Sequence, residues 1–445
     1  TEIGGNAFAY SGVTSIEIPA GVTLIRECLF DACKRLESVT FHGRVTSIDE
    51  RAFADCAALK QIEIPDTVME IWDYAFFSCA SLESVRVPAS VVEMGEYVFA
   101  YCSGLKSAVI DAGVSAITKS AFQDCASLES VKISDSVTAI EKCAFFNCSA
   151  LKEIELSDNV TRVDTVAFSG CSALSGVKIP AALVEIGPGA FSDCAGLTAI
   201  RVDDDNPAYC SLEGVLFNKE KTILVQYPGG RNGAYIIPDG VTRIESYAFS
   251  ECAGLSGVTI PRSVVDIGEL AFLSCSSLVD ITIPDGVIEI SRRSFESCTG
   301  LTNVVVGSGV TLIQSRAFTD CPSLETLYFK GNAPEVAADA FGAPTKVGKV
   351  YYLEGTTGWT NPWNGIPTEA WNPEPRPVLA WRTDETGELL ILSWSGALAG
   401  AVEVAPSAEG PWTVLAPKAE LIGGAWQLAI PISGASGFYR LTVYP

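Results

Sequence analysis

Cysteine is the residue type in this chain whose spacing could do the most chemistry, because a thiol can form a disulfide, bind a metal or act as a nucleophile. Twelve of the fifteen cysteines recur every 23 residues with one break, at positions 33, 56, 79, 102, 125, 148, 171, 194, 252, 275, 298 and 321. Zinc ligands are spaced far more closely than this. If the period reflects stacked units, equivalent thiols have parallel Cβ vectors, which is the wrong geometry for disulfides. We therefore expect small buried side chains.

Three cysteines fall outside this register. Cys28 lies five residues before Cys33, and Cys143 lies five residues before Cys148, so a disulfide within either pair remains an open alternative. The third is Cys210. Because the total is odd, at least one thiol stays unpaired in a monomer.

The other residues that could do chemistry form no catalytic constellation. The single histidine, His42, follows the end of a predicted strand and is expected to be a solvated turn residue, and no G-x-S-x-G motif accompanies it. The run from Asp203 to Asn206 could suggest calcium, but an EF-hand loop needs glycine where this chain has Ala208. An Asx-type turn is the alternative interpretation. The sequence thus predicts no catalytic residue, no cofactor, no metal site and no enzyme.

Phenylalanine shows which element repeats. It occurs at positions 8, 30, 53, 76, 99, 122, 145, 168, 191, 249, 272, 295, 318 and 341. The spacings are 23 residues except for 22 at the start and 58 in the middle. The unit reads A-F-x-x-C-x-x-L-x-x-I-x-I-P-x-x-V-x-x-I and is clearest in residues 52–71. A period of 20–29 residues with L-x-x-I-x-I inside it is the signature of a leucine-rich repeat.

The residue types assign a role to each position of the unit. Ile62 and Ile64 are predicted to point inward from a short strand and Glu63 outward, and Pro65 ends the strand because it has no N–H for a sheet. The segment around Phe53 is predicted to be a short helical turn. One coil cannot bury its own apolar face, so stacked coils must share a continuous core and a parallel sheet. The expected fold class is α/β, a leucine-rich-repeat solenoid with the sheet on one face.

The outward strand positions are the candidate ligand face. Core positions are nearly invariant along the array, whereas these positions vary in charge and size, either because they bind something or because solvated positions drift. The eight residues selected as candidate contacts are Glu17, Glu63, Arg86, Lys132, Glu155, Lys178, Arg201 and Tyr328. The same position in other units holds Thr40, Val109, Thr259, Thr282 and Val305.

The A-F-x-x-C and I-P-x-x-V-x-x-I segments closely resemble the BspA-type leucine-rich repeats of bacterial surface proteins, from residue 1 to about residue 345. The resemblance implies an exported protein that binds other proteins or host surfaces. The chain opens inside a repeat, with neither an initiator methionine nor the terminal cap that repeat arrays need. We therefore expect a signal peptide in a missing upstream portion.

The repeat is interrupted once. The 58-residue gap contains two β-rich runs joined by four polar residues, Asn218 to Lys221, which predicts a hairpin insertion over residues 203–235. A similar N-P-x-Y…G-V-L-F insertion occurs in the family that the chain resembles.

The C-terminal part changes character. After Phe341 the repeat fades, and residues 342–372 resemble a closing cap, which makes the predicted solenoid residues 1–372. Residues 373–377 are interpreted as a stiff proline-rich linker. Short β-like runs over residues 378–445 predict a small all-β sandwich-like module, which weakly resembles immunoglobulin-like modules.

Composition narrows the partners. The chain has 30 basic and 53 acidic residues, a formal charge of −23, which argues against nucleic acid and anionic lipid. No apolar run approaches the ~18 residues of a membrane helix. The first hypothesis is a monomeric, non-enzymatic protein-binding and adhesion scaffold, secreted or on a bacterial cell surface, with its ligand on the concave or lateral face. The alternative is a carbohydrate or cell-wall-binding protein that uses the C-terminal tryptophans, Trp381, Trp394, Trp412 and Trp426, with the solenoid as a spacer.

Overall fold

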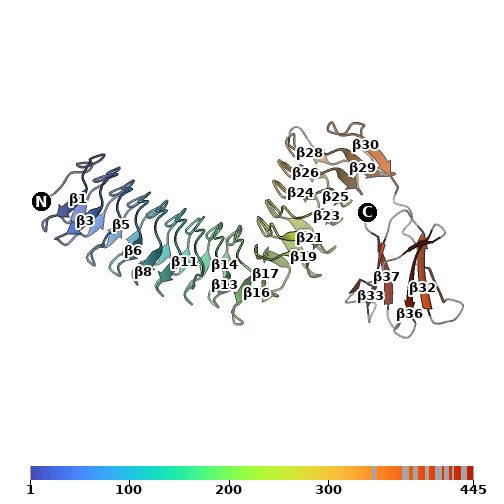
Figure 1. Ribbon diagram of the computed structural model, residues 1–445, viewed down its shortest axis with the longest axis horizontal. Coiled ribbons are helices and arrows are strands. Elements are labelled where there is room, and N and C mark those ends of the chain that lie inside the picture. The colour runs from blue at the N-terminus through green and yellow to red at the C-terminus, as the bar shows by residue number, and fades with distance from the viewer. Residues whose placement is uncertain are drawn as a thin grey trace. The chain divides into compact units, whose positions relative to one another are not determined.

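Stacked coils of 23 residues make up most of the chain, and each coil consists of two strands joined by turns. A computed structural model describes residues 2–342, 347–372, 380–383, 389–395, 400–405, 413–414, 420–422, 425–431 and 438–443. The chain divides into two compact units, Thr1–Glu369 and Ala370–Pro445. In the first unit the coils follow one another in chain order (Figure 1).

The first element of a coil is a strand of four or five residues, and equivalent strands pair in parallel one period apart. We call this set the long-strand ladder. Its members are β1 (Ser15–Ile18), β3 (Ser38–Phe41), β6 (Ser84–Val87), β8 (Ser107–Ile110), β10 (Ser130–Ile133), β13 (Gly176–Ile179), β15 (Ala199–Val202), β19 (Gly233–Ile236), β21 (Leu255–Thr259), β23 (Asp280–Ile283), β25 (Asn303–Val306), β27 (Thr326–Phe329) and β29 (Lys349–Leu353), and β30 (Thr368–Trp371) closes it.

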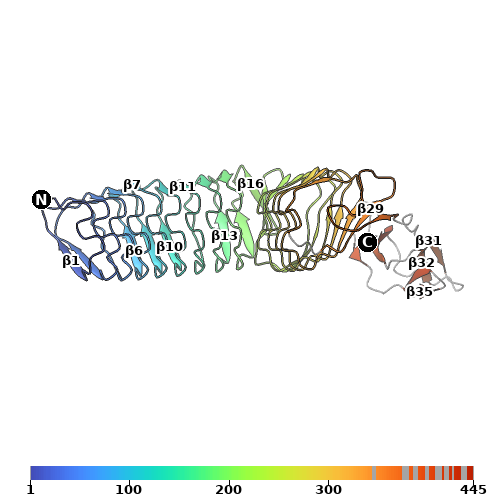
Figure 2. The ribbon, with the colours of Figure 1, turned by 90° about the horizontal axis from the view of Figure 1, so that it is seen from above.

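The second element is a two-residue strand on the other edge of the coil, as Figure 2 shows for β7 and β11 opposite β6 and β10. We call this set the short-strand ladder. Its members are β2 (Leu24–Ile25), β4 (Ser47–Ile48), β5 (Glu70–Ile71), β7 (Glu93–Met94), β9 (Ala116–Ile117), β11 (Ala139–Ile140), β12 (Arg162–Val163), β14 (Glu185–Ile186), β20 (Arg243–Ile244), β22 (Asp266–Ile267), β24 (Glu289–Ile290), β26 (Leu312–Ile313) and β28 (Glu335–Val336).

Two coils lack a regular long strand, and one of them is the coil from which the strand was predicted. Around Ile62 only the isolated bridge Gln61↔Ser84 forms, and the residues around Ile154 form no strand. Ile62 and Ile64 are nevertheless buried and Glu63 is exposed. The core therefore sets the direction of these side chains even where the ladder hydrogen bonds are incomplete.

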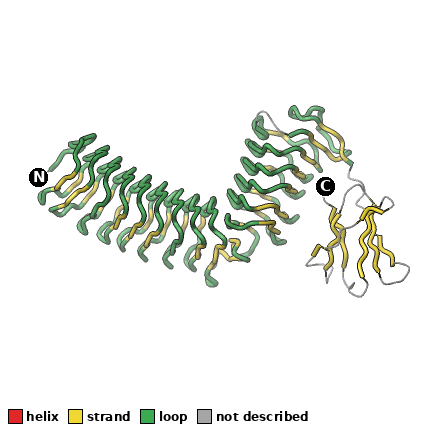
Figure 3. Tube along the Cα trace, in the orientation of Figure 1, coloured by secondary structure: helices red, strands yellow, loops and turns green. Residues whose placement is uncertain are grey.

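The segment around each phenylalanine is a series of turns, and the predicted helical turn is wrong. Residues two before and two after the ring have positive φ, as at Arg51 (54°) and Asp55 (56°) on either side of Phe53. A right-handed helix cannot pass through a left-handed residue every fourth position. The part of the chain that the structure describes contains no helix (Figure 3). The solenoid is therefore all-β, and the α/β label does not apply to it.

These turns bond each coil to the next. In the coil of Phe53, the N–H groups of Arg51, Phe53 and Asp55 donate to carbonyls of the following coil, with N···O distances of 2.7–3.0 Å. The same alternate N–H groups do so in coil after coil, and we call this set the turn ladder. Most coils are thus bonded to their neighbours at two strands and at one turn, which satisfies backbone groups that the interior would otherwise leave unpaired.

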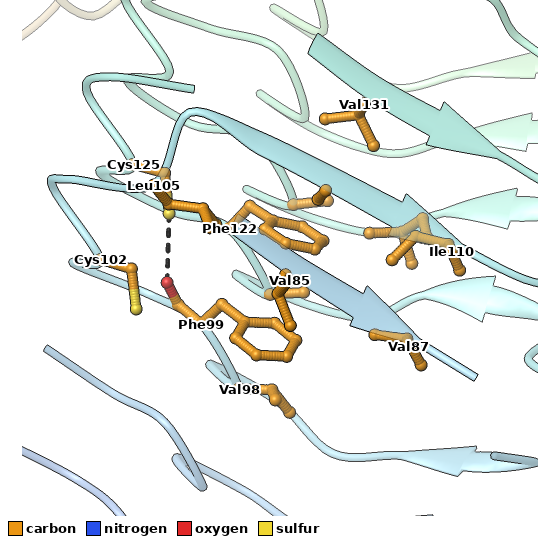
Figure 4. Packing of buried hydrophobic residues seen from close by; sticks show 14 of the residues in the cluster. Val85, Val87, Val98, Phe99, Cys102, Leu105, Ile110, Phe122, Cys125 and Val131 are labelled. Carbon is orange, nitrogen blue, oxygen red and sulfur yellow. Dashed lines mark hydrogen bonds between the residues drawn. The ribbon is translucent and has the colours of Figure 1, made fainter. Parts of the chain in front are cut away.

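The phenylalanines form the centre of the core. From Phe8 to Phe191 successive ring centroids lie 5.2–5.5 Å apart, and from Phe249 to Phe341 they lie 4.8–5.7 Å apart, with planes within 15° of parallel. Figure 4 shows Phe99 and Phe122 in this arrangement, with strand valines and isoleucines beside them. This offset stacking is one of the favoured aromatic geometries.

The insertion divides this core into two clusters. In the gap, β16 (Tyr209–Leu212), β17 (Val215–Asn218) and β18 (Ile223–Gln226) pair antiparallel in that order. Leu216 packs in the cluster before the insertion, and Val215 and Phe217 pack in the cluster after it. One strand thus faces both cores.

Tyr227 takes the place of a phenylalanine inside the insertion. Its ring is 2% exposed and lies 5.0 Å from that of Phe249, 22 residues ahead. Three residues after it, where other coils have cysteine, the chain has Gly230. A Cβ at Gly230 would lie 2.8 Å from the carbonyl oxygens of Ala195 and Leu197, so only glycine fits there.

The second unit contains strands only, among its described residues. Two antiparallel sheets form, in the orders β31-β32-β36-β35 and β34-β33-β37. The strands are β31 (Ala380–Thr383), β32 (Leu389–Ser395), β33 (Gly400–Ala405), β34 (Thr413–Val414), β35 (Glu420–Ile422), β36 (Ala425–Pro431) and β37 (Phe438–Val443). The predicted linker, residues 373–377, lies outside the described residues.

Candidate functional site

The eight candidate contacts lie along the outward side of the long-strand ladder. The register aligns Arg86 with Val109 and Lys132, and aligns Lys178 with Arg201. Seven of the eight are exposed, and Tyr328 is half-buried against Tyr351, with ring centroids 5.0 Å apart. Glu63 and Glu155 occupy the same outward position in the two coils without a regular strand. The stacking of the coils thus brings the eight residues to one face, each in a different coil.

Ion pairs neutralise much of the charge on this face. The Arg86 guanidinium lies 2.8 Å from an oxygen of Asp66 and 2.6 Å from one of Asp111, and the hydrogen bond to Asp66 raises its pKa. Lys178 lies 3.1 Å from Asp203, and this hydrogen bond lowers the pKa of the Asp203 carboxyl. Such exposed pairs contribute little to stability, because water and salt screen them. The charges therefore stay available to a partner that offers better contacts.

The C-terminal part of the face differs from the N-terminal part. Beyond the insertion the positions aligned with the candidate contacts are uncharged, from Ile236, which is 71% exposed, to Tyr328 and Tyr351. Val305 was predicted to be outward but is only 6% exposed, between Thr282 and Tyr328 in the register. This valine is part of the packed surface and is not a candidate contact.

The residues that suggested catalysis or metal binding have structural partners. His42 follows β3 and is exposed, with Nε2 3.3 Å from Glu17. Asp203 accepts the N–H of Asp205 at 3.2 Å, the Asx-turn geometry that was the alternative to calcium. In the described residues no three His, Cys, Asp or Glu side chains are placed to share a metal ion.

The in-register cysteines are buried free thiols with a shared hydrogen bond. In eleven of the twelve, Sγ donates to the carbonyl of a phenylalanine in the preceding coil at 2.9–3.3 Å, as from Cys125 to Phe99 in Figure 4. Burial raises the pKa of the Cys171 and Cys321 thiols to about 12. They are therefore protonated donors, and a thiol at this position satisfies a carbonyl that an alanine would leave with one partner fewer. Cys28, Cys143 and Cys210 are also free thiols.

Sequence reasoning missed a cluster of aromatic side chains on the outside of two neighbouring coils. Trp72, Tyr74, Phe77, Tyr97 and Tyr101 surround the turns that follow β5 and β7, and we call them the aromatic corner. The signal was present as five aromatic residues outside the phenylalanine stack in a 30-residue stretch. It was missed because only strand positions were compared between units.

The repeat geometry can now be compared with known proteins. The family model for the BspA type leucine rich repeat region matches residues 1–129, 115–207 and 233–347. The chain belongs to this family. The unmatched stretch between residues 207 and 233 coincides with the antiparallel insertion.

Solved structures of leucine-rich repeat proteins resemble this BspA-type chain. A leucine rich cell surface protein from Faecalibacterium prausnitzii is 32% identical over 83% of this chain and 93% of its own, with a TM-score of 0.65. A leucine-rich repeat protein from Bacteroides ovatus is 28% identical over 74% of this chain and 82% of its own, with a TM-score of 0.54. One from Eubacterium ventriosum, 21% identical over 72% and 87% with a TM-score of 0.51, shows the fold alone. No curated protein matches the chain.

The BspA-type assignment places the protein among leucine-rich repeat proteins, which are typically non-enzymatic scaffolds. In the described part of the chain, no helix is long and apolar enough to cross a membrane.

Proposed function

We propose that this BspA-type chain is a non-enzymatic protein-binding scaffold of a bacterial cell surface or secreted fraction. The outward side of the long-strand ladder is its ligand face. The observation that carries the proposal is the contrast along one ladder, where inward residues repeat with little change while Glu17, Arg86, Lys132 and Lys178 differ from unit to unit at fixed spacing. The likeness to a cell surface protein from Faecalibacterium prausnitzii supports the proposed location at the cell surface or in the secreted fraction.

The test uses the full chain, offered to extracellular-matrix proteins, host-cell surfaces and bacterial cell-wall glycans. The face variant carries Arg86→Glu, Lys132→Glu and Lys178→Glu. Saturable binding of a protein by the parent chain, weakened at least tenfold in the face variant, is the expected result.

The control variant makes the same change of charge beside the short-strand ladder. It carries Arg26→Glu, Arg162→Glu and Arg243→Glu, all of which are exposed or half-buried. Equal weakening by both variants would show that net charge matters and the ladder face does not. Binding to glycans alone would favour the carbohydrate hypothesis, in which the tryptophan-rich C-terminal unit is the attachment site.

A further inference from the structure

The aromatic corner carries several large apolar side chains that are exposed. Trp72 is 47% exposed and Tyr101 43%, and they are joined by Met69 (51%) and Val92 (52%). These four are among ten large hydrophobic side chains that are exposed in the described residues, yet they fall within 33 residues of sequence. Large exposed apolar patches are typical of interaction sites, because a partner that covers them removes apolar surface from water.

Four of the five rings of the corner contact one another across two coils. Tyr74 stacks on Tyr97 with ring centroids 4.9 Å apart, and its other neighbour, Phe77, lies 5.6 Å away. Phe77 in turn lies 5.2 Å from Tyr101. On the short-strand side, the N–H of Val92 donates to the carbonyl of Met69 at 2.9 Å, so these two residues are also neighbours. Met69 and Val92 thus directly precede β5 and β7, and Trp72 directly follows β5.

The fold does not require these side chains. One period before and after Trp72 the chain has Asp49 and Gly95, and one period before and after Phe77 it has Ala54 and Ala100. The preceding coil keeps the same buried phenylalanine stack without an aromatic residue outside it. The corner thus adds exposed apolar surface with no gain to the core.

The charges around the corner favour a cationic partner. Glu70 and Glu93 are aligned by the pairing of β5 with β7, and neither has an ion pair among the described residues. The one lysine in contact with the corner, Lys119, pairs with Glu96 at 2.7 Å and has its Nζ 5.4 Å from the Tyr97 ring. Lys119 thus shows that a cation binds here to a carboxylate and an aromatic face together. Trp72, the best type of ring for a cation, has no cation over it among the contacts of the described residues.

We propose that the aromatic corner binds an arginine- or lysine-bearing segment of a partner protein. The cationic group lies against Trp72 and between Glu70 and Glu93, and the aliphatic stem of its side chain, or an apolar neighbour, covers Met69 and Val92. Tryptophan and tyrosine are among the residues that contribute most binding energy at protein interfaces. The carboxylates repel anionic ligands and so favour a cationic one. This proposal rests on the protein-binding function but places the contact away from the outward side of the long-strand ladder.

The test pans a phage library of random twelve-residue peptides against the full chain, with depletion on a corner variant that carries Trp72→Ala and Tyr101→Ala. The retained peptides are expected to be enriched in arginine or lysine beside an apolar residue. A synthetic copy of one retained peptide should bind the corner variant at least roughly 30-fold more weakly than the parent, as expected for loss of a central aromatic contact.

Two further variants separate the outcomes. Glu70→Gln with Glu93→Gln should weaken the peptide about tenfold at low salt, and less at high salt because exposed charges are screened. The Arg86, Lys132 and Lys178 face variant should bind the peptide unchanged, even if it loses the partner of the long-strand ladder. Equal thermal unfolding of parent and variants checks the fold. Retained peptides without cationic residues, equal binding to the corner variant, or no retained peptide would each overturn the proposal, and none of these results bears on the ladder face.

Discussion

Replacing Phe145 by alanine tests whether the stack of rings holds the coils together. The side chain is fully buried, with ring centroids 5.4 Å from Phe122 and 5.2 Å from Phe168. Deleting a buried aromatic side chain costs about 3–5 kcal/mol, and each ring pair contributes roughly 0.5–1.5 kcal/mol beyond area burial. Because Phe145 has two such neighbours, we expect a loss in the upper half of that range, about 4–5 kcal/mol.

Two comparison variants show where this energy resides. Phe8 is half-buried and has one stacked neighbour, Phe30, so Phe8→Ala should cost only about 1–2 kcal/mol. Glu63 is exposed and should be silent within about 0.5 kcal/mol when changed to alanine.

The assay is a denaturant titration of the full chain followed by circular dichroism. Since the insertion separates two core clusters, the transition shifted by Phe145→Ala should differ from the one shifted by Phe272→Ala. Equal losses of unfolding free energy in Phe145→Ala and Glu63→Ala would refute the assignment of inward and outward positions. Equal losses from Phe145→Ala and Phe8→Ala would refute the contribution of the second neighbour.

Three other perturbations follow from the same structure. In the folded protein a thiol reagent should label at most the three partly exposed cysteines, and all fifteen in denaturant, as counted by mass spectrometry; rapid labelling of a buried thiol such as Cys148 would contradict the packing. The Glu296 side chain is only 4% exposed and pairs with Arg316 at 2.6 Å. Glu296→Gln should therefore lower the free energy of unfolding by about 1–3 kcal/mol, measured by denaturant titration. An unchanged midpoint would mean that this ion pair does not stabilise the coil. Burial raises the pKa of Asp193, so its proton is held more tightly in the folded state and the carboxylate destabilises the fold as pH rises above its unfolded pKa. Asp193→Asn should therefore raise stability at pH 7 by up to about 1 kcal/mol and leave it unchanged at pH 3, whereas the same gain at both pH values would exclude titration as the cause.

The period and the inward residues could be predicted because they follow from burial alone. Every coil must bury the same apolar positions, so Phe53, Cys56, Ile62 and Ile64 recur with little variation and are all buried. The helical turn was predicted wrongly because an apolar spacing of three around Phe53 suits a helix as well as a run of turns. The deciding feature is positive φ at Arg51 and Asp55. The position of Arg51 gives little sequence signal, because it holds charged, polar, apolar and aromatic residues alike. The position of Asp55 is often Asp, Asn or Gly, which favour positive φ, and this signal was not used.

Long-range alignment limited the remaining predictions. Tyr227 was not recognised as a ring of the stack because the insertion shifts it to 36 residues after Phe191, away from the period. The thiol-to-carbonyl bonds of the cysteines depend on two successive coils and could not be derived from one unit. The candidate face could be predicted as a row of positions, but not the ion pairs of Arg86, because Asp66 and Asp111 lie in turns of the neighbouring coils.

The turn ladder makes the two ends of the solenoid chemically different. Its N–H groups all point from one coil toward the next, so its peptide dipoles add along the stack in the way that they add along a helix, with the positive end toward the C-terminal coils. A segment that covers this ladder at the first coil has to supply hydrogen-bond donors, whereas one that covers it at the last coil has to supply acceptors. The two ends of this ladder therefore differ, and two such solenoids can add end to end along it in one orientation only.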